Sequence, residues 1–325
     1  MTLISRNSNT LDCTPSAPLR APGVPLSAID AIYNKFGPTP RLCFETEDML
    51  IKYEKSQNQA LRKLSLDYLE NVAIREHLAW DAVSHKIYMM RRPTIDVDTV
   101  SMEIEFISPF IASKVMWALK RHELVRLFNR YHAVPSTRKM SGDVFEAYCH
   151  LIFSTNIELD FVPMVRIGGQ PTVRKKKKHR WHSSHTKFSQ SAQSTTLEVL
   201  CKCALTHCDS LHHAPSRVVE CLSNEIKRGI ETNVYYIPIK MNEPGINSIL
   251  LHDGILYLFQ MSVSDTHGIS DKLWTFLRSL KGIPPKENWR FIFVKRPGNA
   301  LACPVPQSDD LLDLALYSAE VEVTS

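Results

Sequence analysis

Two apolar runs joined by the tripeptide His-Asp-Gly at 252–254 restrict the possible folds of this chain more than any other feature. Both runs lie in the segment 247–267, NSILLHDGILYLFQMSVSDTH, and are rich in the branched and aromatic residues that favour β-strands. Asp-Gly between two such runs is a strong signal for a tight turn. We therefore predict a β-hairpin that places Asn247, Gln260 and Ser262 near one another.

The hairpin belongs to a longer series of predicted strands. Strand-like runs occur at 234–239, 246–251, 255–261 and 289–294, and a helical pattern occupies 270–280 between the last two. Strands and helices mixed in one unit favour an α/β or α+β domain with a layered sheet over a helical bundle. The chain has no internal repeats.

The first hundred residues differ in character. Residues 1–28 are rich in Pro, Ser, Thr and Asn, which favours an extended and flexible segment. Residues 29–99 form a helical segment, with an amphipathic pattern between 50 and 85. A second unit, 100–325, begins with a strand-like run followed by Ser108-Pro109, the residues that favour a helix start.

A helix is predicted around the segment MSGDVFEAYCHLIF, which begins at Met140. Its apolar residues recur at helical spacing, and Glu146 and His150 are four residues apart. Residues at this spacing lie on the same face of a helix. The two side chains are therefore expected to share a site.

Composition limits the class of protein. A chain of 325 residues with 44% apolar residues can bury a large core, and no run is long enough to cross a bilayer. The N-terminus lacks the basic and apolar regions of a secretory signal, so we expect an intracellular protein without a membrane partner. The eight cysteines are irregularly spread, which favours reduced thiols.

A basic run dominates the charge distribution. The net charge is +5, yet six of the seven residues at 174–180 are Lys or Arg, within a segment 174–196 that is rich in Ser and His and is expected to be an exposed insertion. Such a run attracts phosphates, and a following aromatic side chain can stack on a base. It also fits a nuclear-import signal, or a solvated run without a partner. The predicted nucleic-acid contacts are Arg174, Lys175, Lys176, Lys177, Lys178, Arg180 and Trp181.

Cys and His residues cluster between 179 and 213. Zinc sites use these residues, but structural sites have paired ligands two to four residues apart, and Cys201-x-Cys203 with His207-Cys208 does not match that spacing cleanly. A His-rich insertion without zinc is the simpler interpretation.

Several motifs, in this order, resemble the C-terminal domain of Crinkler and retrotransposon-hot-spot proteins. They are FGPTPR at 36–41, SPFIASKVMWAL at 108–119, GDVFEAYCH at 142–150, NVYYIP at 233–238, INSILL at 246–251, LYLFQMSVSDTHGI at 256–269, IPPKENWRFIFV at 283–294 and LYSAEV at 316–321. The resemblance covers the chain from about Gly37 to Ser325 and implies a restriction-endonuclease-like core.

In that superfamily the site combines a helix Glu, a strand Asp, and a Glu or Gln two residues before a Lys. The resemblance assigns Glu146 to the helix Glu and Gln260 to the Glu or Gln position. Asn247 and Ser262 replace the expected Asp and Lys. Carboxylates hold Mg²⁺ against a phosphate, and neutral amides rarely compete with water for that ion. With the single charge of Glu146, catalysis is expected to be weak or absent, and Mg²⁺ is expected only if the site is active.

Other side chains are candidates to restore an active site. Asp253 or Asp265 would supply a second carboxylate beside Glu146, Lys272 would replace the missing Lys, and His267 would act as a base. Simpler roles exist for two of them: Asp253 as a residue of the hairpin turn and Lys272 as a solvated helix residue.

The sequence lacks a GxxxxGK[ST] motif, so no ATP binding is expected in this chain. An ATPase domain often precedes the nuclease-like domain in the family resembled, and residues 29–99 are expected to be a remnant of its C-terminal lid. The functional hypothesis is a nuclease-like domain of an effector or mobile-element protein that interacts with nucleic acid, most simply DNA. The alternatives are a non-enzymatic module that binds a host or partner protein, and an active Mg²⁺-dependent endonuclease with a rearranged site.

Overall fold

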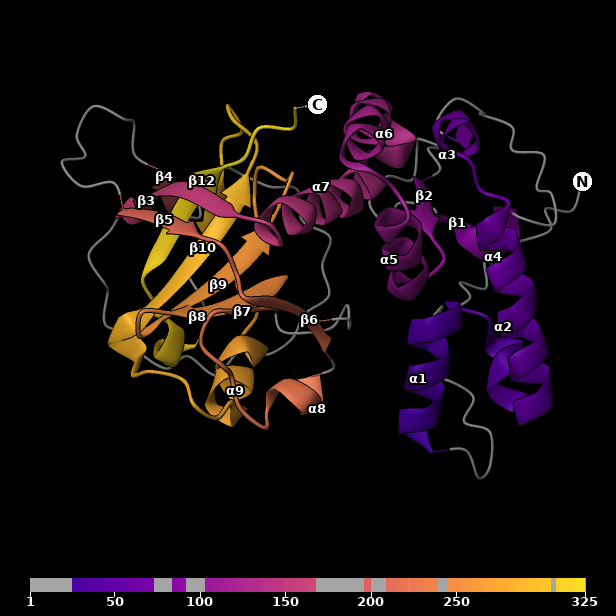
Figure 1. The fold of residues 1–325 in the computed structure, drawn as a ribbon, viewed down its shortest axis with the longest axis horizontal. Coiled ribbons are helices and arrows are strands. Elements are labelled where there is room, and N and C mark those ends of the chain that lie inside the picture. Colours follow the sequence, from indigo (N-terminus) through magenta and orange to yellow (C-terminus); the bar gives the residue numbers. More distant parts are fainter. Residues whose placement is uncertain are drawn as a thin grey trace, which may run out of the picture.

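The computed structural model describes residues 25–72, 84–91, 103–167, 196–199, 209–221, 223–238, 245–304 and 308–324. A group of helices lies on one side of the molecule and a curled mixed sheet on the other, with helix α7 (Arg138–Phe153) running from the first to the second (Figure 1). The α/β class predicted from the sequence is thereby confirmed, with a large sheet flanked by helices.

The helical group contains a short two-stranded sheet. Strands β1 and β2 pair antiparallel, Tyr88 opposite Phe106, and so join residues on both sides of the boundary expected at 99/100. The elements of this part are α1 Leu26–Phe36, η1 Pro40–Phe44, α2 Glu47–Arg62, α3 Leu66–Val72, α4 Ser84–Ile87, β1 Tyr88–Arg91, β2 Glu103–Phe106, α5 Pro109–Trp117, α6 Arg121–Ala133, η2 Pro135–Thr137 and α7 Arg138–Phe153.

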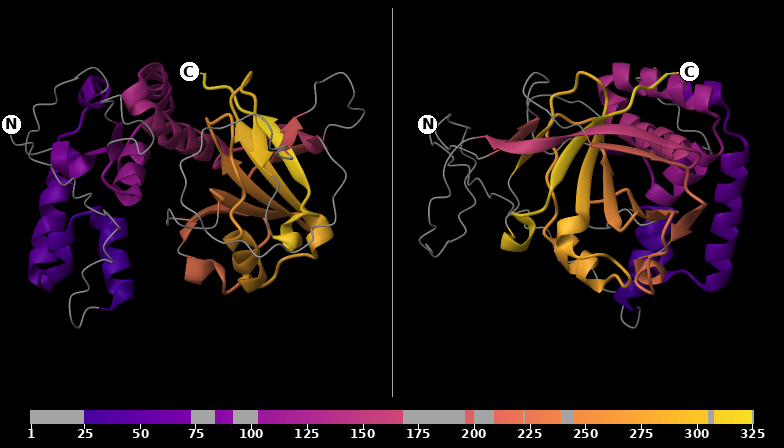
Figure 2. Two further views of the ribbon diagram at one scale, coloured as in Figure 1. Left: turned by 180° about the vertical axis from the view of Figure 1, so that it is seen from behind. Right: turned by 60° about the vertical axis from the view of Figure 1, so that its left-hand side comes forward.

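The described part of the large sheet has the strand order β11-β4-β3-β12-β10-β9-β8-β7-β6, with β5 paired to β3. It is mixed: β6 runs parallel to β7, and β10 runs parallel to both β9 and β12. Figure 2 shows how strongly the sheet curls. The elements are β3 Ile157–Ile167, β4 Thr196–Val199, β5 Asp209–His213, β6 Arg217–Cys221, α8 Ser223–Ile226, β7 Val234–Pro238, β8 Ser248–His252, β9 Ile255–Met261, α9 Lys272–Ser279, η3 Lys286–Asn288, β10 Trp289–Lys295, β11 Ala302–Pro304, η4 Asp309–Leu311 and β12 Leu316–Glu320.

The predicted hairpin is present as β8 and β9, with His252 opposite Ile255. Asp253 and Gly254 form its turn with φ angles of 49° and 72°. Positive φ at both central positions is typical of the type I′ turn, whose twist matches that of the two strands. The turn role considered for Asp253 is thus confirmed.

The predicted start of α5 is also observed. Helix α5 begins at Pro109, and the Ser108 hydroxyl accepts a hydrogen bond from the backbone N–H of Ile111 at 3.2 Å. Pro at the first helical position loses nothing because its missing N–H would have no partner there. This cap fixes the start of α5 directly after β2.

Two apolar cores cover the two faces of the sheet. Along β9, Phe259 and Met261 belong to the core that contains α7, whereas Leu256 and Leu258 belong to the core that contains α9. The alternation follows from the two-residue period of a strand. The helix that carries Glu146 therefore covers one face and α9 the other.

No helix in the described ranges is long and apolar enough to cross a membrane.

Candidate functional site

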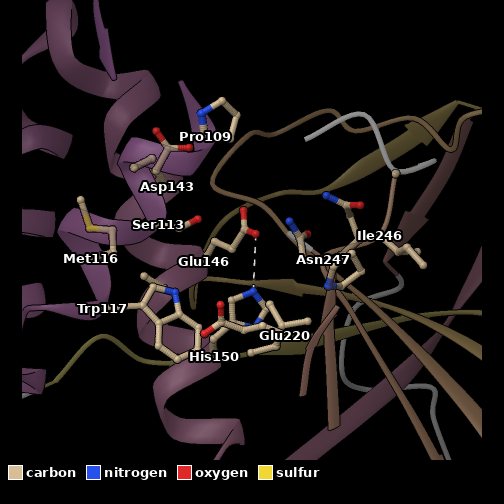
Figure 3. Close-up of a pocket in the computed structure, with 16 residues that line it drawn as sticks. Pro109, Ser113, Met116, Trp117, Asp143, Glu146, His150, Glu220, Ile246 and Asn247 are labelled. Carbon is tan, nitrogen blue, oxygen red and sulfur yellow. Dashed lines mark ion pairs between the residues drawn. The ribbon is translucent and has the colours of Figure 1, made fainter. Parts of the chain in front are cut away.

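A cleft of about 230 Å³ lies where α5 and α7 meet the end of the sheet formed by β6 to β9 (Figure 3). Its walls combine carboxylates, amides and apolar side chains. It is lined by Pro109, Ala112, Ser113, Met116, Trp117, Asp143, Glu146, Ala147, His150, Glu220, Ile237, Pro238, Gly245, Ile246, Asn247 and Gln260. Three residues predicted from the sequence, Glu146, Asn247 and Gln260, therefore lie at one cleft, although they come from separate elements.

Glu146 and His150 contribute to the cleft from α7. Glu146 Oε1 lies 3.4 Å from His150 Nε2, as their four-residue spacing predicts. The other ring nitrogen, Nδ1, lies 2.9 Å from the Tyr235 hydroxyl, which donates to Ser248 Oγ at 2.7 Å. His150 is buried and is held by this chain of contacts, so its Nε2 atom has a fixed position beside Glu146.

Asn247 immediately precedes β8 and lies across the cleft from Glu146 (Figure 3). Its backbone N–H donates to the Phe259 carbonyl at 2.8 Å, and its Oδ1 accepts a hydrogen bond from the Met261 N–H at 2.7 Å. The side chain thus continues the ladder between β8 and β9. Its carbonyl oxygen already accepts one hydrogen bond from the protein, which leaves one lone pair for a ligand.

Gln260 lies near the end of β9 and is only 7% exposed. Among the described residues its Oε1 atom has no hydrogen-bond partner, and its Nε2 atom is 3.5 Å from the Met261 carbonyl. A buried carbonyl oxygen without a donor costs free energy, on the order of 1 to 3 kcal/mol. This oxygen is therefore the acceptor in the cleft with the most to gain from a ligand.

Sequence patterns did not predict two acidic residues of the cleft. Asp143 precedes Glu146 by three residues on α7, a spacing that could have indicated it. Burial, followed by the charge of Glu146, raises its pKa to about 7, and Lys139 opposes the shift. Glu220 belongs to β6, which had no clear sequence signal.

Ser262, assigned from the resemblance, is not among the residues that line the cleft. Its side chain is buried and its Oγ accepts a hydrogen bond from the Ser264 N–H at 3.1 Å. Strand β10 carries Lys295 beside it, since the Ser262 N–H donates to the Val294 carbonyl. Lys295 Nζ contacts Glu320 Oε1 at 2.9 Å and the Asn299 carbonyl, so this lysine is already paired.

The other candidate residues also lie outside the cleft. Asp253 is exposed at the hairpin turn, 3.3 Å from His252, and Asp265 is exposed on the loop after β9. Lys272 is exposed at the first position of α9, on the far face of the sheet from α7. His267 packs edge-on against Phe293, and burial lowers its pKa. The structure therefore does not bring these four to Glu146.

The cleft offers few donors for a metal ion. In the ranges that the structure describes, no three His, Cys, Asp or Glu side chains are placed to hold one metal ion. Glu146 and Asp143 would be the anionic ligands, with Gln260 Oε1 as a neutral one. Mg²⁺ usually keeps several waters and is bound through one or two carboxylates.

Two further predicted sites fall on residues outside the described ranges. The first is the basic run 174–180 with Trp181. The second is the part of the Cys and His cluster that ends at Cys208. His212 and His213 are described on β5. The His213 ring stacks on that of His252, with 3.9 Å between the ring centroids.

The cleft has a distinct chemical character. Three carboxylates, one imidazole and two carboxamides line it, and no described residue that lines it is Lys or Arg. Such a surface attracts cations and disfavours a bare phosphate. Comparison of the chain with protein-family models, with curated proteins and with solved structures gives no match.

Proposed function

We propose that the chain carries a nuclease-like domain on a restriction-endonuclease-like scaffold, similar to the C-terminal domain of Crinkler and retrotransposon-hot-spot proteins. Its role would be to bind nucleic acid, with weak cleavage or none. The observation that supports the proposal is the meeting of Glu146, Asn247 and Gln260 at one cleft. The resemblance points to these same three positions from the sequence alone.

The charges of the cleft support the loss of catalysis. Cleavage by such a site needs carboxylates that hold Mg²⁺ and a Lys that stabilises the developing charge. Here Asn247 is neutral, and its oxygen accepts the Met261 N–H. The Lys position is Ser262, and the adjacent Lys295 is paired with Glu320. The cleft therefore lacks a carboxylate at the expected Asp position and a lysine at the expected Lys position.

Affinity for nucleic acid would come from another part of the chain. The cleft is acidic and repels phosphate, whereas the run RKKKKHR at 174–180 concentrates positive charge. Neutralising phosphates with Lys and Arg releases counterions, which favours binding at low salt. The same run would serve as a nuclear-import signal.

The proposal is tested with labelled double- and single-stranded DNA, with Mg²⁺ or Mn²⁺ and with chelator. We expect salt-sensitive binding that does not need metal, and no cleavage above background. Glu146→Ala should leave the binding unchanged, as should the control Glu158→Ala on an exposed position of β3. Metal-dependent cleavage that is lost in Glu146→Ala would instead establish an enzyme. Neither binding nor cleavage would favour a protein partner.

A further inference from the structure

We propose that the cleft between α5, α7 and the end of the sheet binds a guanidinium group, presented as an arginine side chain by a basic protein partner. This role is separate from nucleic-acid binding and does not depend on it.

The cleft is complementary in charge to a guanidinium cation. Asp143, Glu146 and Glu220 line the cleft, and none of the described residues that line it is Lys or Arg. Glu146 has only the imidazole of His150, at 3.4 Å, as its ion-pair partner among the described residues. The cleft therefore has surplus negative charge, which a bound cation would neutralise.

The carboxamide oxygen of Gln260 accepts no hydrogen bond from the described residues. Gln260 lines the cleft and is 7% exposed, and its Oε1 atom has no donor in the described part of the chain. An N–H group entering the cleft would satisfy this oxygen and recover the free energy that its burial costs. Neither a phosphodiester nor a carboxylate brings such a donor.

The shape of the donor set favours guanidinium over a metal ion. The acidic side chains of the cleft do not converge as the ligands of a metal ion would. No three of the described His, Cys, Asp and Glu residues are placed to hold one ion. Guanidinium is planar and carries five N–H donors, so it reaches several separated acceptors at once. An ammonium group is a compact point charge and would satisfy fewer of them.

An aromatic side chain on the wall of the cleft also favours a guanidinium group. Trp117, the last residue of α5, lines the cleft and is 52% exposed. Guanidinium groups stack on indole rings, where the electron-rich face attracts the cation. The cleft volume of about 230 Å³ is below the roughly 300–1,000 Å³ that is usual for drug-sized ligands, and suits a single side chain.

Isothermal titration of the full chain with N-acetyl-arginine methylamide tests the proposal. We expect saturable one-to-one binding, at least about tenfold weaker binding of the lysine analogue, and no binding of the neutral citrulline analogue. Glu146→Gln should weaken binding about tenfold, and Glu158→Gln should leave it unchanged. Circular dichroism of each variant verifies the fold.

The aromatic wall is tested in the same titration. Trp117→Phe should retain most of the binding, whereas Trp117→Ala should weaken it about fivefold. Equal binding of the arginine and citrulline analogues would overturn the proposal. So would unchanged affinity in Glu146→Gln, or saturation by Mg²⁺ with no guanidinium binding.

A peptide arm separates the two possible sources of the guanidinium group. A short peptide with one central arginine should bind more tightly than the free arginine derivative, because a partner segment adds contacts at the rim. Equal affinities would overturn the assignment to a protein partner and indicate a free guanidinium metabolite.

Discussion

His150 Nε2 lies 3.4 Å from Oε1 of Glu146, one helical turn earlier on α7. The imidazole cannot rotate freely, because its Nδ1 atom is 2.9 Å from the buried Tyr235 hydroxyl. That hydroxyl donates to Ser248 at the start of β8. The contacts therefore connect the helix that carries Glu146 to the strand that follows Asn247.

Tyr235→Phe should destabilise the fold. Removal of the hydroxyl leaves His150 Nδ1 and Ser248 Oγ buried without their partner, at a cost of about 1 to 3 kcal/mol. Urea unfolding of the variant measures the change in the free energy of unfolding. Tyr33→Phe, at an exposed position, is the matched control and should be neutral. A Tyr235→Phe variant as stable as the wild type would mean that the network contributes nothing.

Asp143 should make stability depend on pH. Its pKa rises from 3.8 to about 7 in the folded chain, because of burial and the charge of Glu146. Between about pH 4 and pH 7 the unfolded chain loses this proton before the folded chain does, so the free energy of unfolding falls as pH rises. Above about pH 7 both states are ionised and this fall ends.

Asp143→Asn should remove that dependence. The variant should be more stable than the wild type at pH 8, by on the order of 1 to 3 kcal/mol, and the two should converge towards pH 4. Urea unfolding at both pH values measures the difference, with the exposed Asp253→Asn as control. Parallel stability profiles for Asp143→Asn and wild type would contradict the assigned cause.

Asn247→Asp should strengthen Mg²⁺ binding. The new carboxylate keeps the acceptor for the Met261 N–H, so the fold is retained, and it adds a negative charge across from Glu146. We expect the Mg²⁺ dissociation constant to fall about tenfold. The control Asn288→Asp introduces the same charge at an exposed site away from the cleft. Equal Mg²⁺ affinity in both variants would argue against a nuclease-type arrangement of the cleft.

The basic run should determine the salt dependence of DNA binding. Substitution of the four lysines at 175–178 by Ala should weaken binding at low salt and reduce the slope of log K against log salt, by about 0.9 for each phosphate that the variant no longer neutralises. Binding measured between roughly 50 and 200 mM salt gives this slope. An unchanged slope would place the DNA-binding residues elsewhere. The control replaces four exposed lysines, Lys52, Lys55, Lys227 and Lys281.

Local signals in the sequence were sufficient for part of the fold and of the site. The Asp-Gly turn determines the hairpin β8–β9, and helical spacing determines that Glu146 and His150 are neighbours. These features depend on residues close together in the chain. The position of Asn247 beside the end of β9 follows from the hairpin, because its N–H donates to the Phe259 carbonyl.

Features that depend on distant residues could not be predicted. Glu220 reaches the cleft only because β6 pairs with β7, and β6 has no clear alternation of apolar residues. Ser262 was expected in the site, yet it is buried away from the cleft. Lys295 lies beside it through the parallel pairing of β9 with β10, more than thirty residues later in the chain. Pairing between distant strands is determined by the whole sheet and not by the local sequence.

DNA binding without cleavage is tested most directly when both are measured in one sample. A DNA duplex that carries a donor and an acceptor dye reports binding by anisotropy and cleavage by loss of energy transfer, with Mg²⁺ present and the purified full chain in excess. We expect a rise in anisotropy that reverses on addition of salt, while energy transfer stays constant. Loss of energy transfer that requires Mg²⁺ and disappears in Glu146→Ala would contradict it.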